Sequence, residues 1–187
     1  MRVICIATGP SLTKDDADYC QGKGKVYVVN DAYKLAPWAD VLYACDKSWW
    51  DHHKGAPEFT GEKWTLTDTA AKQYNLNWIN CIFGRDWSND PNFIAGGGNS
   101  GFQCLNLAVI QNPGAEFFLL GYDMQARDQN KKHFFGNHPP GLDRGPNYTG
   151  WVKNFIRASA QIKEKMINCT VDTALPCFEQ KPLREAF

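Results

Sequence analysis

Short apolar runs that end in glycine, asparagine or aspartate recur along this chain, and they constrain its fold more than any other feature. The clearest runs cover residues 2–7, 25–29, 41–45 and 115–120. Continuous apolar runs of this length are typical of strands buried on both faces of a parallel sheet. Segments with helical character separate them, and such alternation places helices on both faces of the sheet. We therefore predict an α/β fold, a three-layer sandwich with a mostly parallel sheet.

Weaker patterns complete the predicted order of elements. Residues 62–67 and 78–83 are further strand candidates, and residues 84–98 are predicted to form a polar loop. The longest helix is expected over residues 151–166, followed by a last short strand at 167–170 and a small tail.

One long segment carries no helical or strand pattern. It covers residues 122–150, begins at a predicted strand end, and contains His133 and His138. Structureless segments of this length are uncommon unless they are functional. We predict that 122–150 is a flap over an active site, with a plain surface insertion as the alternative. The chain as a whole, residues 1–187, has the length of a single α/β domain.

Composition excludes some classes of protein. The formal net charge is zero, which gives no support to a nucleic-acid binder held by bulk electrostatics. The seven cysteines form no C-x-x-C pair, and this usage fits a reducing cytosol. No apolar run approaches membrane-spanning length. We expect a cytoplasmic protein without a membrane partner.

Three turns follow predicted strands and suit an anionic ligand. The first turn is Thr8–Leu12, the second is Gly96–Gly101 and the third is Leu120–Asp123. In an open α/β sheet, ligands bind at the carboxyl ends of the strands. Glycine turns that lead into a helix offer free backbone N–H groups to a phosphate. The turns therefore predict a nucleotide or another phosphorylated ligand.

Polar side chains stand at or beside further strand ends. They are Asn30, Asp31, Asp46 and Asp123, and parallel strands would bring them to one edge of the sheet. Asp46 and Asp123 are suited to hold Mg²⁺ beside a phosphate. Binding of ribose hydroxyls and capping of the following helices are the alternatives.

The flap supplies the candidate catalytic groups. His133 and His138 are the best general bases in the chain, because histidine titrates near neutral pH. Cations in the same segment would stabilise the charge of a leaving phosphate. These cations are Arg127, Lys131, Lys132 and Arg144.

Together these segments resemble the bacterial sialyltransferases of glycosyltransferase family 42 and the related DUF115 (MptE-like) proteins. Residues 4–12 are similar to their G-x-G-P-S-L turn, with the first glycine replaced. Residues 99–123 are similar to the S-G…A…L-G…I-x-L-x-G-x-D segment. The resemblance spans roughly the first two thirds of the chain. Residues 168–183 are also similar to the tails of small phage-encoded proteins of this kind.

The resemblance implies a Rossmann-like nucleotide-binding domain that acts as a glycosyltransferase. In the sialyltransferases the corresponding turns hold a cytidine nucleotide sugar, and a flap histidine acts as base. His133 or His138 would take that role here, and no cofactor would be required. With the strand-end and glycine residues added, the candidate nucleotide-binding residues are Gly9, Pro10, Ser11, Asn30, Asp31, Gly98, Asn99, Ser100, Gly101, Gly121 and Asp123.

Two alternatives stay open beside a nucleotide-sugar transferase. Residues 29–46 are similar to the D-G-A…P-D…D run of pterin and thiamine pyrophosphokinases. That resemblance implies Mg²⁺ as cofactor, with Asp31, Asp46 and Asp123 as ligands. The second alternative is a non-catalytic nucleotide-binding protein. The sequence leaves the acceptor open and allows a homo-oligomer.

Overall fold

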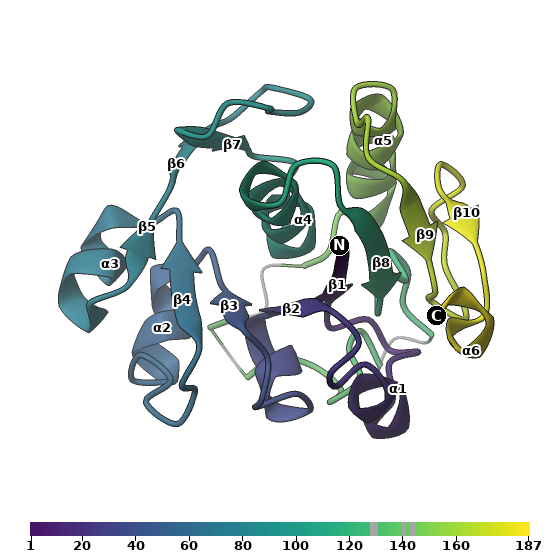
Figure 1. Ribbon diagram of the computed structural model, residues 1–187. Helices are drawn as coiled ribbons and strands as arrows, with labels where there is room; N and C mark the ends of the chain where they lie inside the picture. The colour runs from purple at the N-terminus through teal and green to yellow at the C-terminus, as the bar shows by residue number, and fades with distance from the viewer. Residues whose placement is uncertain (128–130, 140, 143–144) are drawn as a thin grey trace.

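The computed structural model describes residues 1–127, 131–139, 141–142 and 145–187 of the chain. In these ranges an eight-stranded sheet forms the centre of the molecule, and all of its strands pair in parallel (Figure 1). The order across the sheet is β10-β9-β8-β1-β2-β3-β4-β5. The strands are β1 (Arg2–Ile6), β2 (Lys25–Val29), β3 (Val41–Tyr43), β4 (Glu62–Thr65), β5 (Asn77–Trp78), β8 (Glu116–Leu120), β9 (Met166–Asn168) and β10 (Glu179–Gln180).

Helices cover both faces of the sheet, so the predicted Rossmann-like three-layer sandwich is confirmed (Figure 1). One layer holds α4 (Ser100–Gln111) and α5 (Tyr148–Ser159). The other holds α1 (Lys14–Tyr19), the 3₁₀ helix η1 (Asn30–Lys34), α2 (Lys47–His52) and α6 (Leu183–Ala186), and α3 (Asp68–Tyr74) lies beside α2.

Alternating residues of β1 face the two helical layers in turn. Val3 and Cys5 belong to the apolar cluster of the α4 and α5 layer, whereas Ile4 and Ile6 belong to the cluster of the opposite layer. All four side chains are fully buried. A strand with two buried faces needs apolar residues at every position, which explains the continuous apolar run in the sequence.

The direction of strand succession reverses at β1. From β1 the chain passes outward through β2, β3, β4 and β5, then returns through α4 to β8 on the other side of β1. Backbone hydrogen bonds continue the pairing of β1 with β8 beyond the ends of the strands. Ala7 N donates to Leu120 O at 2.8 Å, and Gly9 N donates to Gly121 O at 2.9 Å. Such a switch point opens a crevice at the carboxyl ends of the strands, where α/β proteins bind ligands.

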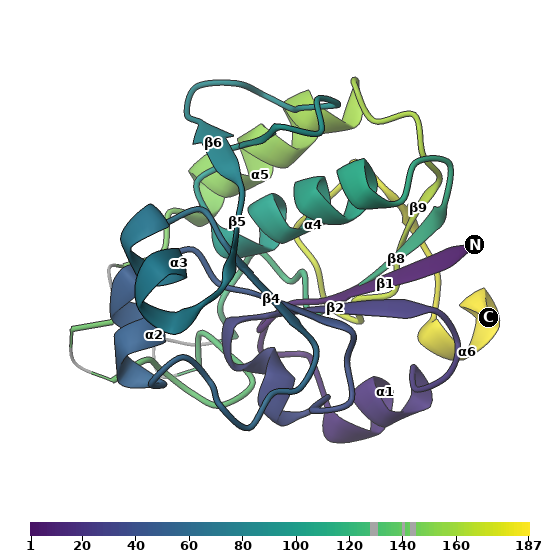
Figure 2. The ribbon, with the colours of Figure 1, turned by 60° about the vertical axis from the view of Figure 1, so that its left-hand side comes forward.

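A separate pair of parallel strands lies outside the main sheet, beside α4 (Figure 1 and Figure 2). It consists of β6 (Asn80–Ile82) and β7 (Phe93–Ala95). The prediction of one strand over 78–83 and a polar loop over 84–98 was therefore wrong in detail. The Asn106 side chain holds this region from α4: its Oδ1 accepts from Ala95 N at 2.8 Å, and its Nδ2 donates to Ser88 O at 2.7 Å.

The flap segment and the helix after it have different bounds from those expected. Described residues between 122 and 147 form no helix or strand, and His133 and Gly136 form an isolated antiparallel bridge. Helix α5 begins at Tyr148 and ends at Ser159, earlier than predicted at both ends. No described helix has the length and apolar character needed to cross a membrane.

Candidate functional site

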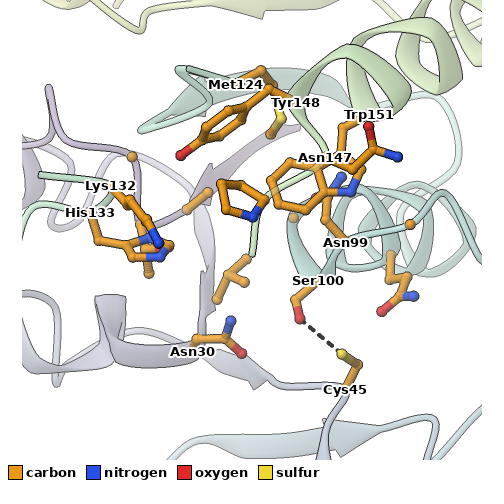
Figure 3. A pocket seen from close by; sticks show the side chains of 18 of the residues that line it. Asn30, Cys45, Asn99, Ser100, Met124, Lys132, His133, Asn147, Tyr148 and Trp151 are labelled. Atoms are coloured by element: carbon orange, nitrogen blue, oxygen red, sulfur yellow. Dashed lines mark hydrogen bonds between the residues drawn. The ribbon is translucent and has the colours of Figure 1, made fainter. Parts of the chain in front are cut away.

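A cavity of about 740 Å³ opens at the carboxyl ends of β1, β2, β3 and β8 (Figure 3). Its walls come from the three turns, the N-termini of α4 and α5, and the flap segment. Segments far apart in the sequence therefore meet at the switch point of the sheet.

Ten of the predicted site residues line this cavity. They are Gly9, Asn30, Asp46, Gly98, Asn99, Ser100, Gly101, Gly121, His133 and His138. Four others lie outside the lining, and they are Pro10, Ser11, Asp31 and Asp123. The role of either group in nucleotide binding stays a prediction.

Asp123 lies behind the cavity wall and joins the third turn to the first. Its Oδ1 accepts a hydrogen bond from the backbone N–H of Ser11 at 2.7 Å. Among the described residues its buried Oδ2 has no hydrogen-bond partner. Burial raises the pKa of Asp123 to about 6, although the bond from Ser11 opposes the shift. The Asp123 side chain therefore links the first and third turns through a hydrogen bond.

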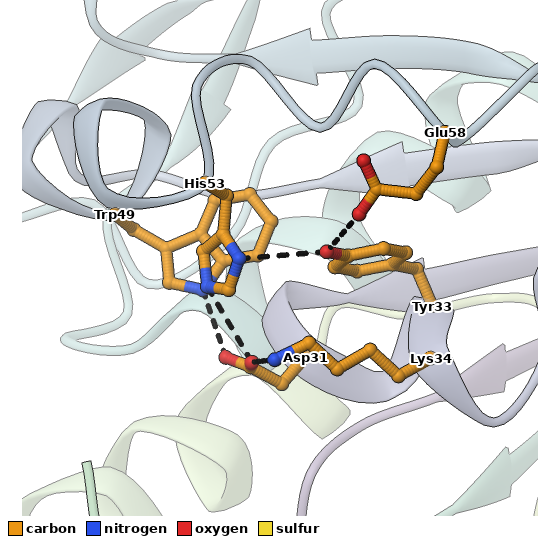
Figure 4. Close-up of polar contacts among 6 residues, drawn as sticks. All are labelled: Asp31, Tyr33, Lys34, Trp49, His53 and Glu58. Atoms are coloured by element: carbon orange, nitrogen blue, oxygen red, sulfur yellow. Dashed lines mark hydrogen bonds and ion pairs between the residues drawn. The ribbon is translucent and has the colours of Figure 1, made fainter. Parts of the chain in front are cut away.

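Asp31 points away from the cavity into a polar cluster (Figure 4). It accepts from Lys34 Nζ at 2.6 Å and from Trp49 Nε1 at 2.9 Å, and His53 Nε2 lies 3.4 Å away. Burial alone would raise the pKa of Asp31, but these donors outweigh it and hold the pKa below its usual range. Tyr33 extends the cluster, since its hydroxyl donates to Glu58 at 2.5 Å.

The residue before Asp31 faces the cavity instead. Asn30 has a φ of +48°, a left-handed conformation that few non-glycine residues adopt. The Asp31 contacts anchor η1, in which Asn30 is the first residue. The cluster in Figure 4 therefore supports the cavity floor indirectly.

The second turn forms the end of the cavity at the N-terminus of α4. Asn99 caps α4, because its Oδ1 accepts from Phe102 N at 2.9 Å. Its buried Nδ2 has no partner within the described part of the chain, although the residue lines the cavity. A helix N-terminus with a spare amide donor favours an anionic ligand.

Helix α5 holds the second turn in place. Asn154 Nδ2 donates to Gly97 O at 2.7 Å. Gly97 and Gly98 have φ values of +57° and +84°, which glycine adopts without strain. A β-carbon on Gly98 would lie 3.0 Å from Trp151 Cδ1. Close contact with α5 and positive φ together explain why glycine stands here.

Cys45 lies on the cavity floor beside Ser100 (Figure 3). The Ser100 hydroxyl donates to Cys45 Sγ at 3.1 Å, and the thiol donates to Asp46 Oδ2 at 3.2 Å. Burial raises the pKa of the Cys45 thiol to about 12. The thiol is therefore protonated at neutral pH and is a polar contact, not a nucleophile.

The flap brings both predicted histidines and one lysine to the cavity. Thr8 Oγ1 lies 3.0 Å from His133 Nδ1, and the ring centroids of His133 and His138 are 4.5 Å apart. Lys132 also lines the cavity, whereas Arg127 and Lys131 do not. Arg144 lies outside the described residues.

Several lining residues were not predicted as site residues. They include Thr8, Thr67, Phe83, Asn147, Tyr148, Trp151 and Asn154. Asn147 caps α5 by accepting from Gly150 N at 3.1 Å, and a good cap beside the flap was a usable signal. Throughout the described ranges no three histidine, cysteine or acidic side chains gather as a metal site.

Comparison with known proteins supports the fold. No protein-family model and no curated protein sequence matches the chain. Among solved structures the chain is similar to the MAf glycosyltransferase from Magnetospirillum magneticum AMB-1, with a TM-score of 0.68 and 10% sequence identity. The match covers 98% of this chain and 34% of that one, so the chain spans about a third of its length. At this identity the two chains share a fold.

Proposed function

We propose that this chain is a glycosyltransferase that transfers a sugar from a nucleotide-sugar donor to a hydroxyl acceptor. One observation carries the proposal: a single cavity at the switch point of the sheet receives the glycine turns and the flap histidines together. Its volume of about 740 Å³ lies in the usual range of small-molecule sites, roughly 300–1,000 Å³.

The donor phosphate fits the α4 end of the cavity. There the N-terminus of α4 and the buried amide of Asn99 offer hydrogen bonds, and Lys132 offers a positive charge. Groups placed in advance at a developing negative charge are usually the largest contribution to catalysis.

The transfer follows from this placement. A flap histidine takes the proton of the acceptor hydroxyl while the acceptor oxygen bonds to the anomeric carbon of the sugar. The bond from that carbon to the phosphate oxygen breaks, and the nucleotide leaves with the electron pair. The structural neighbour is a glycosyltransferase, and the sequence resembles the family 42 sialyltransferases; both support this reaction.

The Mg²⁺-dependent pyrophosphokinase is the less favoured alternative. It needs Asp31, Asp46 and Asp123 around one ion, but only Asp46 lines the cavity. The other two carboxylates are engaged behind it, with Trp49 and Lys34 and with Ser11. A non-catalytic binder would use the same cavity without the histidines.

Thermal unfolding with a panel of ligands is the first test. CMP, UDP, GDP and ADP are screened alone and as nucleotide sugars; a ligand at 100 times its Kd adds about 2.7 kcal/mol of stability. Donor hydrolysis is then measured for the wild type, His133→Ala and His138→Ala. Loss of hydrolysis in one histidine variant with retained donor binding supports the transferase.

Each alternative has its own result in the same panel. Turnover of ATP that strictly requires Mg²⁺ would instead indicate the pyrophosphokinase. Tight binding without turnover would indicate a binding protein. If no nucleotide or nucleotide sugar shifts the unfolding temperature, all three functions are wrong.

A further inference from the structure

We infer that Thr8 is a positioning residue that holds His133 in the form able to accept a proton from the acceptor hydroxyl. The inference rests on the proposed function and deepens it, because it names His133 as the base. It is carried by the contacts between the first turn and the flap.

Thr8 binds the flap at two points. Its hydroxyl oxygen lies 3.0 Å from His133 Nδ1, and its backbone carbonyl accepts from Phe134 N at 3.1 Å. Thr8 and His133 lie 125 residues apart in the chain. Thr8 itself is 8% exposed and lies two positions after Ile6, the fully buried last residue of β1. A rigid strand end therefore fixes both the main chain and the ring of His133.

Ring packing restricts His133 further. The Phe135 ring stacks on it with centroids 5.0 Å apart and an angle of 6° between the planes. The stack and the Thr8 contact act on different parts of the ring: one on its face, the other on Nδ1. Rotation of the imidazole about its Cβ–Cγ bond would move Nδ1 away from Thr8, and any rotation other than a half-turn would also tilt the ring out of its stack with Phe135.

One tautomer of His133 is assigned to the contact with Thr8, whose hydroxyl can both donate and accept a hydrogen bond. A neutral imidazole carries one N–H, and the nitrogen without hydrogen is the base. In the assigned tautomer Nδ1–H donates to Thr8 Oγ1, the lone pair of the neutral ring lies on Nε2, and Nε2 is the atom that takes the proton of the acceptor hydroxyl. The proton moves to Nε2 as the acceptor oxygen bonds to the sugar and the nucleotide leaves. Thr8 is then the orienting third group beside nucleophile and base.

The test compares Thr8→Val with Thr8→Ser. Valine has the shape of threonine but cannot accept the Nδ1 hydrogen, whereas serine keeps the hydroxyl. Both variants keep the backbone carbonyl that binds Phe134. Thr67→Val is a matched control, because Thr67 also lines the cavity but its hydroxyl donates to Cys45 O at 2.6 Å.

The first measurement needs no enzyme activity. The chain has four histidines, so ¹⁵N-histidine labelling gives a simple NMR spectrum, and His133→Ala assigns the signals of His133. The nitrogen shifts distinguish the two tautomers. We expect the Nδ1–H form in the wild type, Thr8→Ser and Thr67→Val, and a shift toward the Nε2–H form in Thr8→Val. An unchanged His133 signal in Thr8→Val overturns the inference.

The second measurement is the rate of donor hydrolysis across pH. Probes are CMP-N-acetylneuraminic acid, UDP-N-acetylglucosamine and GDP-mannose. Removing a general base costs about 10²–10⁴-fold in rate, and losing its positioning should cost less, about tenfold or more. We expect Thr8→Val to lose this much in kcat with a displaced pH–rate profile, and Thr8→Ser to restore both.

The two measurements separate the possible failures. A wild type that hydrolyses no probe counts against the proposed function, while the NMR spectra still report on Thr8 and His133. An active wild type whose Thr8→Val variant keeps full kcat and the same pH profile overturns the positioning role, even if the tautomer changes.

Discussion

Gly9 lies directly against the carboxylate of Asp123, and this contact leaves no room for a side chain at residue 9. A β-carbon on Gly9 would lie 1.9 Å from Asp123 Oδ2 and 2.5 Å from the carbonyl oxygen of Gly121. The first and third turns are thus packed backbone to backbone where they form the cavity wall. Glycine is required here by space, not by backbone conformation.

Replacing Gly9 by alanine should therefore damage the fold. The new methyl group would collide with backbone that pairs β1 to β8, and such overpacking is expected to lower the free energy of unfolding by about 3 kcal/mol. Gly114→Ala is the control, because its β-carbon meets open space and only its φ of +75° is unfavourable, worth about 1–2 kcal/mol. Urea denaturation measures the free energy of unfolding of both variants. Equal losses of stability in the two would contradict the steric explanation for Gly9.

Stability should depend on pH through Asp123. Its pKa is raised from 3.8 to about 6, so the folded state holds the proton more tightly than the unfolded chain. The resulting stabilisation is complete below about pH 4 and is lost as pH rises through about 6; at about 1.4 kcal/mol per pKa unit it is on the order of 3 kcal/mol.

Asp123→Asn isolates this contribution from all others. The variant cannot release a proton, so the difference in unfolding free energy between wild type and variant should change between pH 4 and 6 and be constant above pH 7. Denaturant titrations at a series of pH values measure it. A difference that does not vary with pH would show that Asp123 titrates normally.

Asp31 should have the opposite effect. Its donors hold its pKa below the usual range, so its stabilisation is present at neutral pH and is lost as pH falls below about 4. Asp31→Asn leaves Trp49 or Lys34 facing an amide N–H. We expect the free energy of unfolding at pH 7 to fall by about 2 kcal/mol.

Asp18→Asn is the control for Asp31. Asp18 pairs with Lys14 on the exposed surface of α1, and such pairs contribute about 0–1 kcal/mol. Thermal unfolding of the two variants at pH 7 gives the comparison. A loss for Asp31→Asn no larger than for Asp18→Asn would mean that the cluster in Figure 4 does not stabilise the fold.

Asn99 should separate ligand binding from stability. Asn99→Ser and Asn99→Asp both keep an oxygen that caps α4, but both lose the buried amide donor, and aspartate adds a negative charge to the cavity. We expect near-normal unfolding temperatures for both variants. Calorimetric titration with the nucleotide that binds the wild type should give weaker binding for serine and weaker still for aspartate. Full affinity in Asn99→Asp would exclude an anion at this helix end.

The fold was predictable because its central strands are buried on both faces. Each appears in the sequence as a continuous apolar run, and a local pattern suffices to recognise it. The pair β6 and β7 was not predictable in this way, since β7 depends on the Asn106 side chain from α4. Short edge elements such as α3, β10 and α6 also owe their structure to neighbours distant in sequence.

The site was predictable only to the level of strand ends. The strand-end rule brought Gly9, Asn30 and Asp46 to one cavity, but it could not decide between neighbours in a tight turn. Asn30 faces the cavity while Asp31 faces Trp49. Contacts across the switch point, such as Thr8 with His133, join residues 125 positions apart, and no local pattern encodes them.

The position of β1 in the sheet has a consequence for biosynthesis. Arg2 pairs with Glu116 of β8 and Val3 with Lys25 of β2, so β1 gains its second neighbour only when β8, far later in the sequence, has been translated. At about 5–20 residues per second the ribosome leaves one edge of β1 open for several seconds. An open apolar edge invites pairing with other chains. Slow folding and a need for chaperones during synthesis are the expected consequences of placing the candidate site beside this strand.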